Sequence, residues 1–470
     1  MAHVDDQCSP GAPSPGRTRE GSDRNKENYA PTCKALSPSH EQQIKSNENT
    51  EDVDRHLSAL KELRISNSTE QLLDDGKSGQ HTDDNHKETT EPRRHDGSED
   101  LLHHDQATVY AYFFENCPVA SELQELRLKV HPTIFQLIAR RRLIENILYV
   151  RLLTSDYKWQ GWSSTEGDEY FKKQKWHTDN ADCETSQKFM SMMRSVADKM
   201  EMATGIFTLH NPRPTVLAFG FAPGGFVQKA LRRNPNAQVT GITLSDKLCG
   251  IPVLVKDKRL IFHPADITLM AGDMGMLPDQ IPADHPDATN FLPRLIRPTA
   301  TFDLVTAEGG VLRPHQALLG SHRELREAHR LKASQLALAV SRVKRGGRMI
   351  VLLHKPETWN SLTLFYTFSK FAQIQLFKPS QQHQYKSSFY MIAKDVQSQS
   401  DEARTAVQRW TREWKVATFG TDEEYEAVVR EHALDVDQVL SEFGQRWIEL
   451  GKPVWEIQRD GLKEKSFTQV

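Results

Sequence analysis

A glycine-rich turn directly after an apolar run is the segment of this 470-residue chain best suited to hold a nucleotide-like ligand. Residues 215–219 are apolar, and Gly220, Gly224 and Gly225 follow at once. Glycines let backbone N–H groups approach a ligand closely, as in the strand–turn–helix units of Rossmann-type sheets. Because no Lys-Ser or Lys-Thr pair follows and the glycines lack dinucleotide spacing, the turn is neither a phosphate loop nor a dinucleotide fingerprint.

The turn that remains is of the kind that surrounds the amino-acid end of S-adenosylmethionine, so it predicts a methyltransferase. The alternative is a tight turn in some other α/β domain, because glycine-rich turns after strands are common. On the first interpretation the cofactor-binding residues of the turn are Gly220, Phe221, Ala222, Pro223, Gly224, Gly225 and Phe226.

Three acidic residues follow later apolar runs, at positions where strands of the same sheet would end. Ligands of an open α/β sheet bind outside the carboxyl ends of its strands. Asp246 is then placed to meet a ribose, and Asp266 to accept a hydrogen bond from an adenine amine. Glu308 follows a run expected at the sheet centre, where a reacting group and the cofactor would lie.

Short apolar runs alternate with helical stretches over residues 181–396, which predicts an α/β fold with a mainly parallel, Rossmann-like sheet and helices on both faces. The stretch 271–298 is rich in Pro and Asp and is predicted to be a surface insertion. The predicted strands are 215–219, 238–244, 260–263, 302–307, 348–353 and 388–393, and the predicted helices 186–200, 225–232, 324–345 and 358–371.

Three further regions flank this domain. Residues 1–104 are acidic, polar and poor in aromatics, so we expect a disordered arm. Residues 105–180 are predicted to form a helical cap, in which aromatics alternate with lysines over 157–176. These suit stacking on a base or ribose, or packing of the cap onto the core. Residues 397–470 are predicted to be a helical extension with four packing anchors, Trp410, Trp414, Trp447 and Trp455.

Composition excludes several classes of protein. The chain has no apolar run long enough to span a membrane and no signal-peptide pattern, so we expect an intracellular protein, in cytoplasm or nucleus, without a membrane partner. Its five cysteines are scattered and include no Cys-x-x-Cys pair, which argues against a disulfide framework and a zinc site. We therefore expect no metal. The part after the acidic arm is mildly basic, which permits contact with nucleic acid.

The order of motifs resembles the FtsJ-like methyltransferase family over about residues 180–395, and is nearest to a group of fungal members. The resemblance implies S-adenosylmethionine as methyl donor and, typically, a ribose 2′-hydroxyl of RNA as acceptor. The motifs are Gly-x-x-Pro-Gly-Gly at 220–225, Asp-Ile-Thr at 266–268, Phe-Asp-Leu-Val at 302–305, Ser-Gln-Leu-Ala-Leu-Ala at 334–339 and Gly-Gly-Arg-Met-Ile-Val-Leu-Leu at 346–353.

Members of this family surround the target hydroxyl with a lysine, an aspartate, a second lysine and a glutamate. The resemblance places the aspartate at Glu308, the second lysine at Leu352 and the glutamate at Phe389, so the set is incomplete. Ala218 also replaces an acidic residue that the family carries at the end of the first strand.

Three residues remain as catalytic candidates. Lys355 lies three positions after Leu352, Glu308 keeps a carboxylate, and Lys199 precedes the first strand with Lys188 as its alternative. His354 is next after Lys355. A lysine with a perturbed pKa would help remove the acceptor proton, and a carboxylate would hold it in place.

Three functions are consistent with these residues. The first is an RNA-directed methyltransferase, favoured by the family likeness and the lysine–aromatic segment. The second is a methyltransferase for a small-molecule acceptor, because Leu352 and Phe389 would make the pocket more apolar. The third is a non-catalytic relative, suggested by Ala218, Glu308 and Phe389 together.

Overall fold

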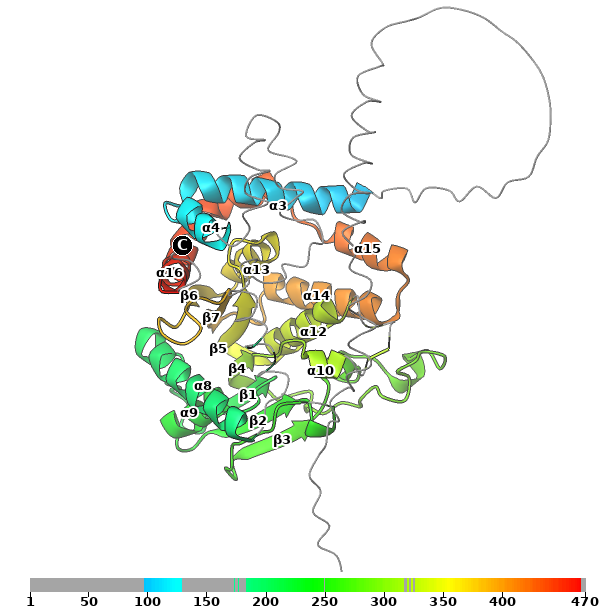
Figure 1. Cartoon of the computed structure of the whole chain (residues 1–470). Coiled ribbons are helices and arrows are strands. Elements are labelled where there is room, and N and C mark those ends of the chain that lie inside the picture. Colours follow the sequence, from blue (N-terminus) through cyan, green and yellow to red (C-terminus); the bar gives the residue numbers. More distant parts are fainter. Residues whose placement is uncertain are drawn as a thin grey trace, which may run out of the picture. The chain divides into compact units, whose positions relative to one another are not determined.

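Figure 1 shows the protein as a computed structural model. The chain divides into two units, Met1–Gln80 and His81–Val470, and every described residue belongs to the second. The structure describes residues 97–128, 183–248, 250–316, 319–320, 323 and 326–465, with Lys173 and Trp176. The predicted arm up to residue 96, most of the predicted cap and nearly all of the lysine–aromatic segment lie outside these residues.

Seven strands form one sheet in the order β3-β2-β1-β4-β5-β7-β6. The first five run parallel, and β7 runs antiparallel between β5 and β6. The order along the chain reverses between β1 and β4, and ligands of such sheets bind at this reversal. The strands are β1 (Thr215–Phe219), β2 (Gln238–Thr243), β3 (Leu260–Pro264), β4 (Phe302–Ala307), β5 (Val343–His354), β6 (Gln373–Phe377) and β7 (Ser388–Val396).

Helices cover both faces of the sheet, so the predicted fold class is confirmed (Figure 1). On one face, α8 (Cys183–Thr204) and α9 (Gly225–Arg233) share a hydrophobic cluster with Ala218, Ile350 and Tyr390. A second cluster joins α12 (Glu327–Arg342), α13 (Trp359–Ser369) and α14 (Asp401–Phe419) to Leu217, Val351 and Phe389. Neighbouring strand residues thus contribute to opposite clusters, as the two-residue period of a strand requires. Short helical turns are η1 (Asp246–Leu248), η2 (Ile267–Leu269), η3 (Pro278–Gln280) and α10 (Arg313–Gln316).

The six predicted strands are present, and the sequence missed only β6 among the strands of the described residues. This edge strand is five residues long and includes the polar residues Gln373 and Gln375, so it lacks a continuous apolar run. The prediction of a surface insertion over 271–298 is wrong in part. Met274, Met276 and Ile296 are buried in the second cluster, because Asp273 accepts hydrogen bonds from the backbone N–H groups of 295 and 296 and folds the segment inward.

Helices outside the predicted domain pack on its core. They are α3 (Gly97–Asn116), α4 (Ala120–Leu128), α15 (Asp422–Glu431) and α16 (Val436–Lys463). Phe113 of α3 lies with its ring centre 4.5 Å from that of Trp455, and Trp414 Nε1 donates to the Thr268 carbonyl at 2.9 Å. All four predicted tryptophan anchors are buried. None of the helices in the described residues has the length and apolar character that crossing a membrane requires.

Candidate active site

The glycine turn after β1 is held against the end of β4. Gly220 has φ +62, and a Cβ added there would lie 2.2 Å from Gly309 Cα. Gln335 of α12 fixes Gly309 from the other side, because its amide accepts from the Gly309 N–H at 2.9 Å and donates to the Gly309 carbonyl at 3.0 Å. Position 220 therefore requires glycine both for its dihedral angle and for its close approach to backbone.

The far half of the turn packs into the protein. Phe221 and Phe226 are fully buried core residues, and the N–H of Leu254 donates to the Pro223 carbonyl at 3.0 Å. A Cβ at Gly224 would meet Val255, and a Cβ at Gly225 would meet Met193 of α8. These five predicted cofactor residues, 221 and 223–226, are not among the residues that line the cavity described next. Their role in cofactor binding stays a prediction.

A cavity of about 130 Å³ opens at the carboxyl ends of β1, β2, β3 and β4. Four predicted site residues line it, namely Gly220, Ala222, Asp266 and Glu308, beside Thr243 and Gly309. Ligand pockets are commonly about 300–1,000 Å³, so the described residues enclose part of a site for a ligand of cofactor size. The glycine-lined approach and the polar groups in its wall fit an adenosyl cofactor.

Glu308 places a buried carboxylate in the wall of this cavity. Its Oε1 atom makes no hydrogen bond with any residue that the structure describes. Burial raises the pKa of Glu308 to about 8, and the neighbouring Thr306 hydroxyl offsets this only in part. A carboxyl group with such a pKa at the end of a central strand is suited to take up or release a proton near neutral pH.

Glu308 continues a row of residues across three strands. The register pairs Ala307 with Val351 and Leu352 with Tyr390, so Glu308, Leu352 and Tyr390 come side by side on the face covered by α8 and α9. Burial raises the pKa of the Tyr390 phenol, and the nearby Glu308 charge raises it further. Sequence reasoning missed Tyr390, although its place follows from the two-residue period of β7.

The interpretation that placed Phe389 in the acceptor pocket is wrong. Phe389 is buried in the cluster on the opposite face, with its ring 6.0 Å from that of Phe365 in α13. Side chains alternate along a strand, so Tyr390 and Ser388 share the Glu308 face and Phe389 cannot reach it. On the Glu308 face the neighbouring residues of the row are Leu352 and Tyr390, and neither is among the residues that line the cavity.

Asp266 lines the cavity as the sequence predicts, within a network of buried charges. Its Oδ1 accepts from the Thr268 N–H and hydroxyl, and its Oδ2 accepts from Arg323 Nη2 at 2.8 Å. Although burial alone would raise it, hydrogen bonds from His315 and the charge of Arg323 hold the pKa of Asp266 well below its usual value. An adenine amine would share a carboxylate that already has these partners, and this contact stays a prediction.

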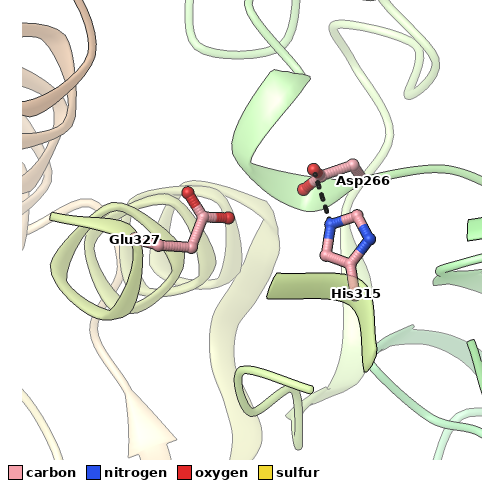
Figure 2. A group of neighbouring side chains, drawn as sticks. All are labelled: Asp266, His315 and Glu327. Carbon is pink, nitrogen blue, oxygen red and sulfur yellow. Dashed lines mark ion pairs between the residues drawn. The ribbon is translucent and has the colours of Figure 1, made fainter. Parts of the chain in front are cut away.

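Figure 2 shows His315 of α10 turned toward Asp266, with Glu327 of α12 opposite. One atom from each of the three side chains lies within 4.8 Å of the others, a spacing compatible with a metal ion. Arg323 already provides a cation there, because its Nη2 atom donates to both Asp266 and Glu327, at 2.8 and 2.7 Å. The Arg323 guanidinium therefore explains how two carboxylates can be buried here without a metal ion. The expectation that the protein binds no metal stays a prediction.

The candidate lysines lie beside one loop, 378–387, which joins β6 to β7. Lys199 Nζ on α8 donates to the side chains of Gln381 and Gln382, at 2.6 and 3.2 Å. Lys355 follows the end of β5, and its N–H donates to the Ser387 carbonyl. Lys188 instead forms an exposed pair with Glu184. Asp246 begins η1, and its side chain lies outside what the structure describes.

Comparison with known proteins places the protein in the class of S-adenosylmethionine-dependent methyltransferases. More narrowly, residues 194–396 match the family model of the FtsJ-like methyltransferases, so the chain carries an FtsJ-like methyltransferase domain with S-adenosylmethionine as its cofactor. None of the curated proteins matches the chain.

Solved structures resemble the fold distantly. A Plasmodium falciparum protein assigned as a ribosomal RNA methyltransferase is 15% identical, covers 43% of this chain and 97% of its own, and has a TM-score of 0.28. Human N-acetylserotonin methyltransferase in complex with SAM is 12% identical, covers 45% of this chain and 56% of its own, and has a TM-score of 0.26. Human methyltransferase-like protein 13 in complex with SAH is 14% identical, covers 53% of this chain and 99% of its own, and has a TM-score of 0.25.

Replacing Gly220 with alanine is expected to weaken S-adenosylmethionine binding by more than about tenfold, because the new methyl group must displace Gly309, which Gln335 holds in place. Titration calorimetry on the whole protein measures the affinity. Gly205→Ala is the matched control, since Gly205 has φ +64 and open space around it. Equal affinities of the two variants would show that close approach to Gly309 is unimportant.

Proposed function

We propose that this protein methylates the ribose 2′-hydroxyl of RNA, with Glu308 as the group that receives the hydroxyl proton. The observation that carries the proposal is the unpartnered Glu308 Oε1 atom, buried in the wall of the cavity at the end of β4. The FtsJ-like domain and the mildly basic part of the chain after residue 105 support RNA as the acceptor.

In this proposal the residues of the site have separate roles in binding the cofactor and the acceptor. Gly220, Ala222 and Gly309 would allow close approach of the ligand to backbone, and the acceptor would lie against the row Glu308–Leu352–Tyr390, of which Glu308 lines the cavity. S-adenosylmethionine supplies an electrophilic methyl group. The acceptor oxygen gains this methyl group as the bond from the methyl carbon to the sulfonium sulfur breaks, S-adenosylhomocysteine leaves, and the hydroxyl proton passes to Glu308 Oε1. Low polarity around the carboxylate makes it more basic, which suits proton removal from a weakly acidic hydroxyl.

The direct test is transfer of labelled methyl groups from S-adenosylmethionine to total RNA by the whole protein. We expect the label in dinucleotides that resist alkaline hydrolysis, because alkaline cleavage of RNA requires a free 2′-hydroxyl. Label in alkali-released mononucleotides would identify base methylation instead and would contradict the ribose assignment. No label in RNA, from a folded protein that binds its cofactor, would contradict RNA as acceptor.

A small-molecule acceptor is the second candidate, favoured by Leu352 and Tyr390. The family resemblance expects a lysine where Leu352 stands, and this row presents an isobutyl group and an aromatic ring instead. A phenol or a carboxylic acid loses its proton more readily than a ribose hydroxyl, so it needs less help from a complete acid–base set. Methylation of such compounds, with none of RNA, would favour this alternative.

A further inference from the structure

A cluster of positively charged and ionisable nitrogen groups lies where the β6–β7 loop meets the end of β5. The loop supplies Lys378, His383 and Lys386, and the end of β5 supplies His354 and Lys355. Burial lowers the pKa of His354, and the positive charges of the neighbouring Lys378, Lys355 and Lys386 lower it further. We call these five residues the basic cluster.

The loop that carries the cluster is fixed by Lys378. This side chain is 4% exposed, and its Nζ donates to the backbone carbonyls of His383, Lys386 and Ser388 at 3.3, 2.6 and 2.8 Å. Both ends of the loop are thus tied to one ammonium group. Lys355 adds a backbone hydrogen bond to Ser387 at 3.0 Å, which joins the loop to the end of β5.

Carboxylates are missing from the immediate surroundings of three members. Within the described part of the chain, the side chains of His354, His383 and Lys386 form no ion pair, and the charges that act on the two histidines are all positive. Partial burial and the charges of Lys386, Lys378 and His354 lower the pKa of His383 to about 3. Burial also lowers the pKa of Lys386. His383 is therefore neutral near pH 7 and offers an N–H donor, and a bound anion would favour the protonated form of each of these groups.

Backbone strain coincides with the cluster. Lys355 and His383 have φ values of 52 and 60, and the described residues contain one other non-glycine residue with positive φ, Asp395. Such conformations are sparsely populated for side chains of this size and gather at ligand sites. Both strained positions therefore belong to the basic cluster.

The cluster lies just beyond the row that contains Glu308. Leu352 pairs with Tyr390, and two residues further along the same strands His354 pairs with Ser388. Two residues of a strand span roughly 7 Å, and alternate residues point to the same face. His354, a member of the basic cluster, therefore lies next along the strand from the row Glu308–Leu352–Tyr390 and on the same face.

We infer that the basic cluster binds a phosphate group of the RNA acceptor next to the nucleotide that is methylated. The choice of RNA rests on the function proposed above, and the need for an anion rests on the cluster itself. Histidine and lysine N–H groups from two strand ends would surround the phosphate oxygens, as in other phosphate contacts that position a nucleic acid. The cluster would thereby set which hydroxyl reaches Glu308.

The test is fluorescence anisotropy of a short labelled single-stranded RNA with the whole protein over a range of salt concentrations. The test variants are Lys386→Gln, which removes a charge, and His383→Asn, which removes the imidazole and retains a residue that tolerates positive φ. Lys415→Gln is the control, because Lys415 is an exposed lysine of α14 on the other face of the sheet.

We expect the double variant to bind RNA at least about tenfold more weakly and its dependence of log K on log salt to flatten by about 0.7 for each lost phosphate contact. Lys386→Gln alone should show part of both effects, and Lys415→Gln neither. The same RNA with a 5′-hydroxyl in place of a 5′-phosphate shows which phosphate is bound. Unchanged binding indicates an internal phosphodiester, and lost binding indicates the terminal 5′-phosphate. Either result supports a phosphate site.

Wild-type affinity and salt slope in the double variant would overturn the inference, and so would a wild-type protein that binds no RNA. Cofactor affinity, measured on the same samples, is expected to stay unchanged. RNA binding that depends on the cluster without any methyl transfer would contradict the proposed function and leave the phosphate site standing, so the two failures can be told apart.

Discussion

Replacing Arg323 with methionine is expected to lower the free energy of unfolding by about 3–5 kcal/mol, the largest stability loss that we predict. Arg323 is 3% exposed, and its guanidinium donates to Asp266 and Glu327 while Asp287 lies 3.8 Å away. Methionine has a similar volume but no charge, so the variant leaves Asp266 without its guanidinium partner and leaves Glu327 with Arg330, whose Nη1 lies 3.4 Å from Glu327 Oε2. Urea denaturation followed by circular dichroism measures the loss.

The same variant has a pH signature. In the wild-type protein the pKa of Asp266 lies below its usual value of 3.8, so its ion pair stabilises the fold above that pH and is lost below it. Buried carboxylates without a cation favour protonation, and the stability gap between variant and wild type should therefore shrink as the pH falls through about 4. Arg345→Met, at an exposed arginine, is the control. A pH-independent loss would indicate a packing defect alone.

Glu308→Gln is expected to reduce methyl transfer by about 10²–10⁴-fold, because positioned acid–base groups contribute rate factors of this size. Glutamine retains the shape of the side chain and cannot accept the proton. S-adenosylmethionine affinity should fall much less than the rate, since glycine backbone and other cavity walls remain. Single-turnover transfer to RNA measures the effect, and a rate within about twofold of wild type would exclude Glu308 as the base.

The raised pKa of Glu308 fixes the sign of two pH effects. In the wild-type protein the transfer rate should rise with pH through about 8, because the deprotonated carboxylate is the active form. Stability should change in the opposite direction. Between the ordinary glutamate value of 4.5 and about 8, the folded protein keeps a proton that the unfolded chain releases, so stability falls as the pH rises through this window. Both slopes should disappear in Glu308→Gln.

Most of the sheet could be predicted from the sequence because its strands are buried on both faces and read as apolar runs. The edge strand β6 was hidden for the opposite reason, since Gln373 is exposed at an edge and only Leu376 is buried. The inward fold of 271–298 depends on Asp273, whose carboxylate satisfies backbone N–H groups more than twenty residues away. A local pattern of Pro and Asp carries no information about such a contact.

The candidate site was predicted where it depends on strand ends and missed where it depends on side-chain direction. Gly220, Asp266 and Glu308 meet at the cavity because the carboxyl ends of parallel strands share one edge. Arg323 carries no sequence signal for its role, since its partners are 57 and 4 residues away. Phe389 was placed in the pocket and Tyr390 was missed, because motif matching does not record which face of a strand a residue occupies.

The hydrogen bond from Trp414 to the Thr268 carbonyl has a consequence for how the molecule is divided. The tail helix α14 reaches the segment that carries Asp266, and Trp447 and Trp455 of α16 belong to the same hydrophobic cluster as strand residues of the methyltransferase domain. We therefore expect the sheet and the tail to unfold together, in one transition. The family resemblance ends at residue 396, but the hydrophobic cluster that stabilises the fold includes residues on both sides of that position.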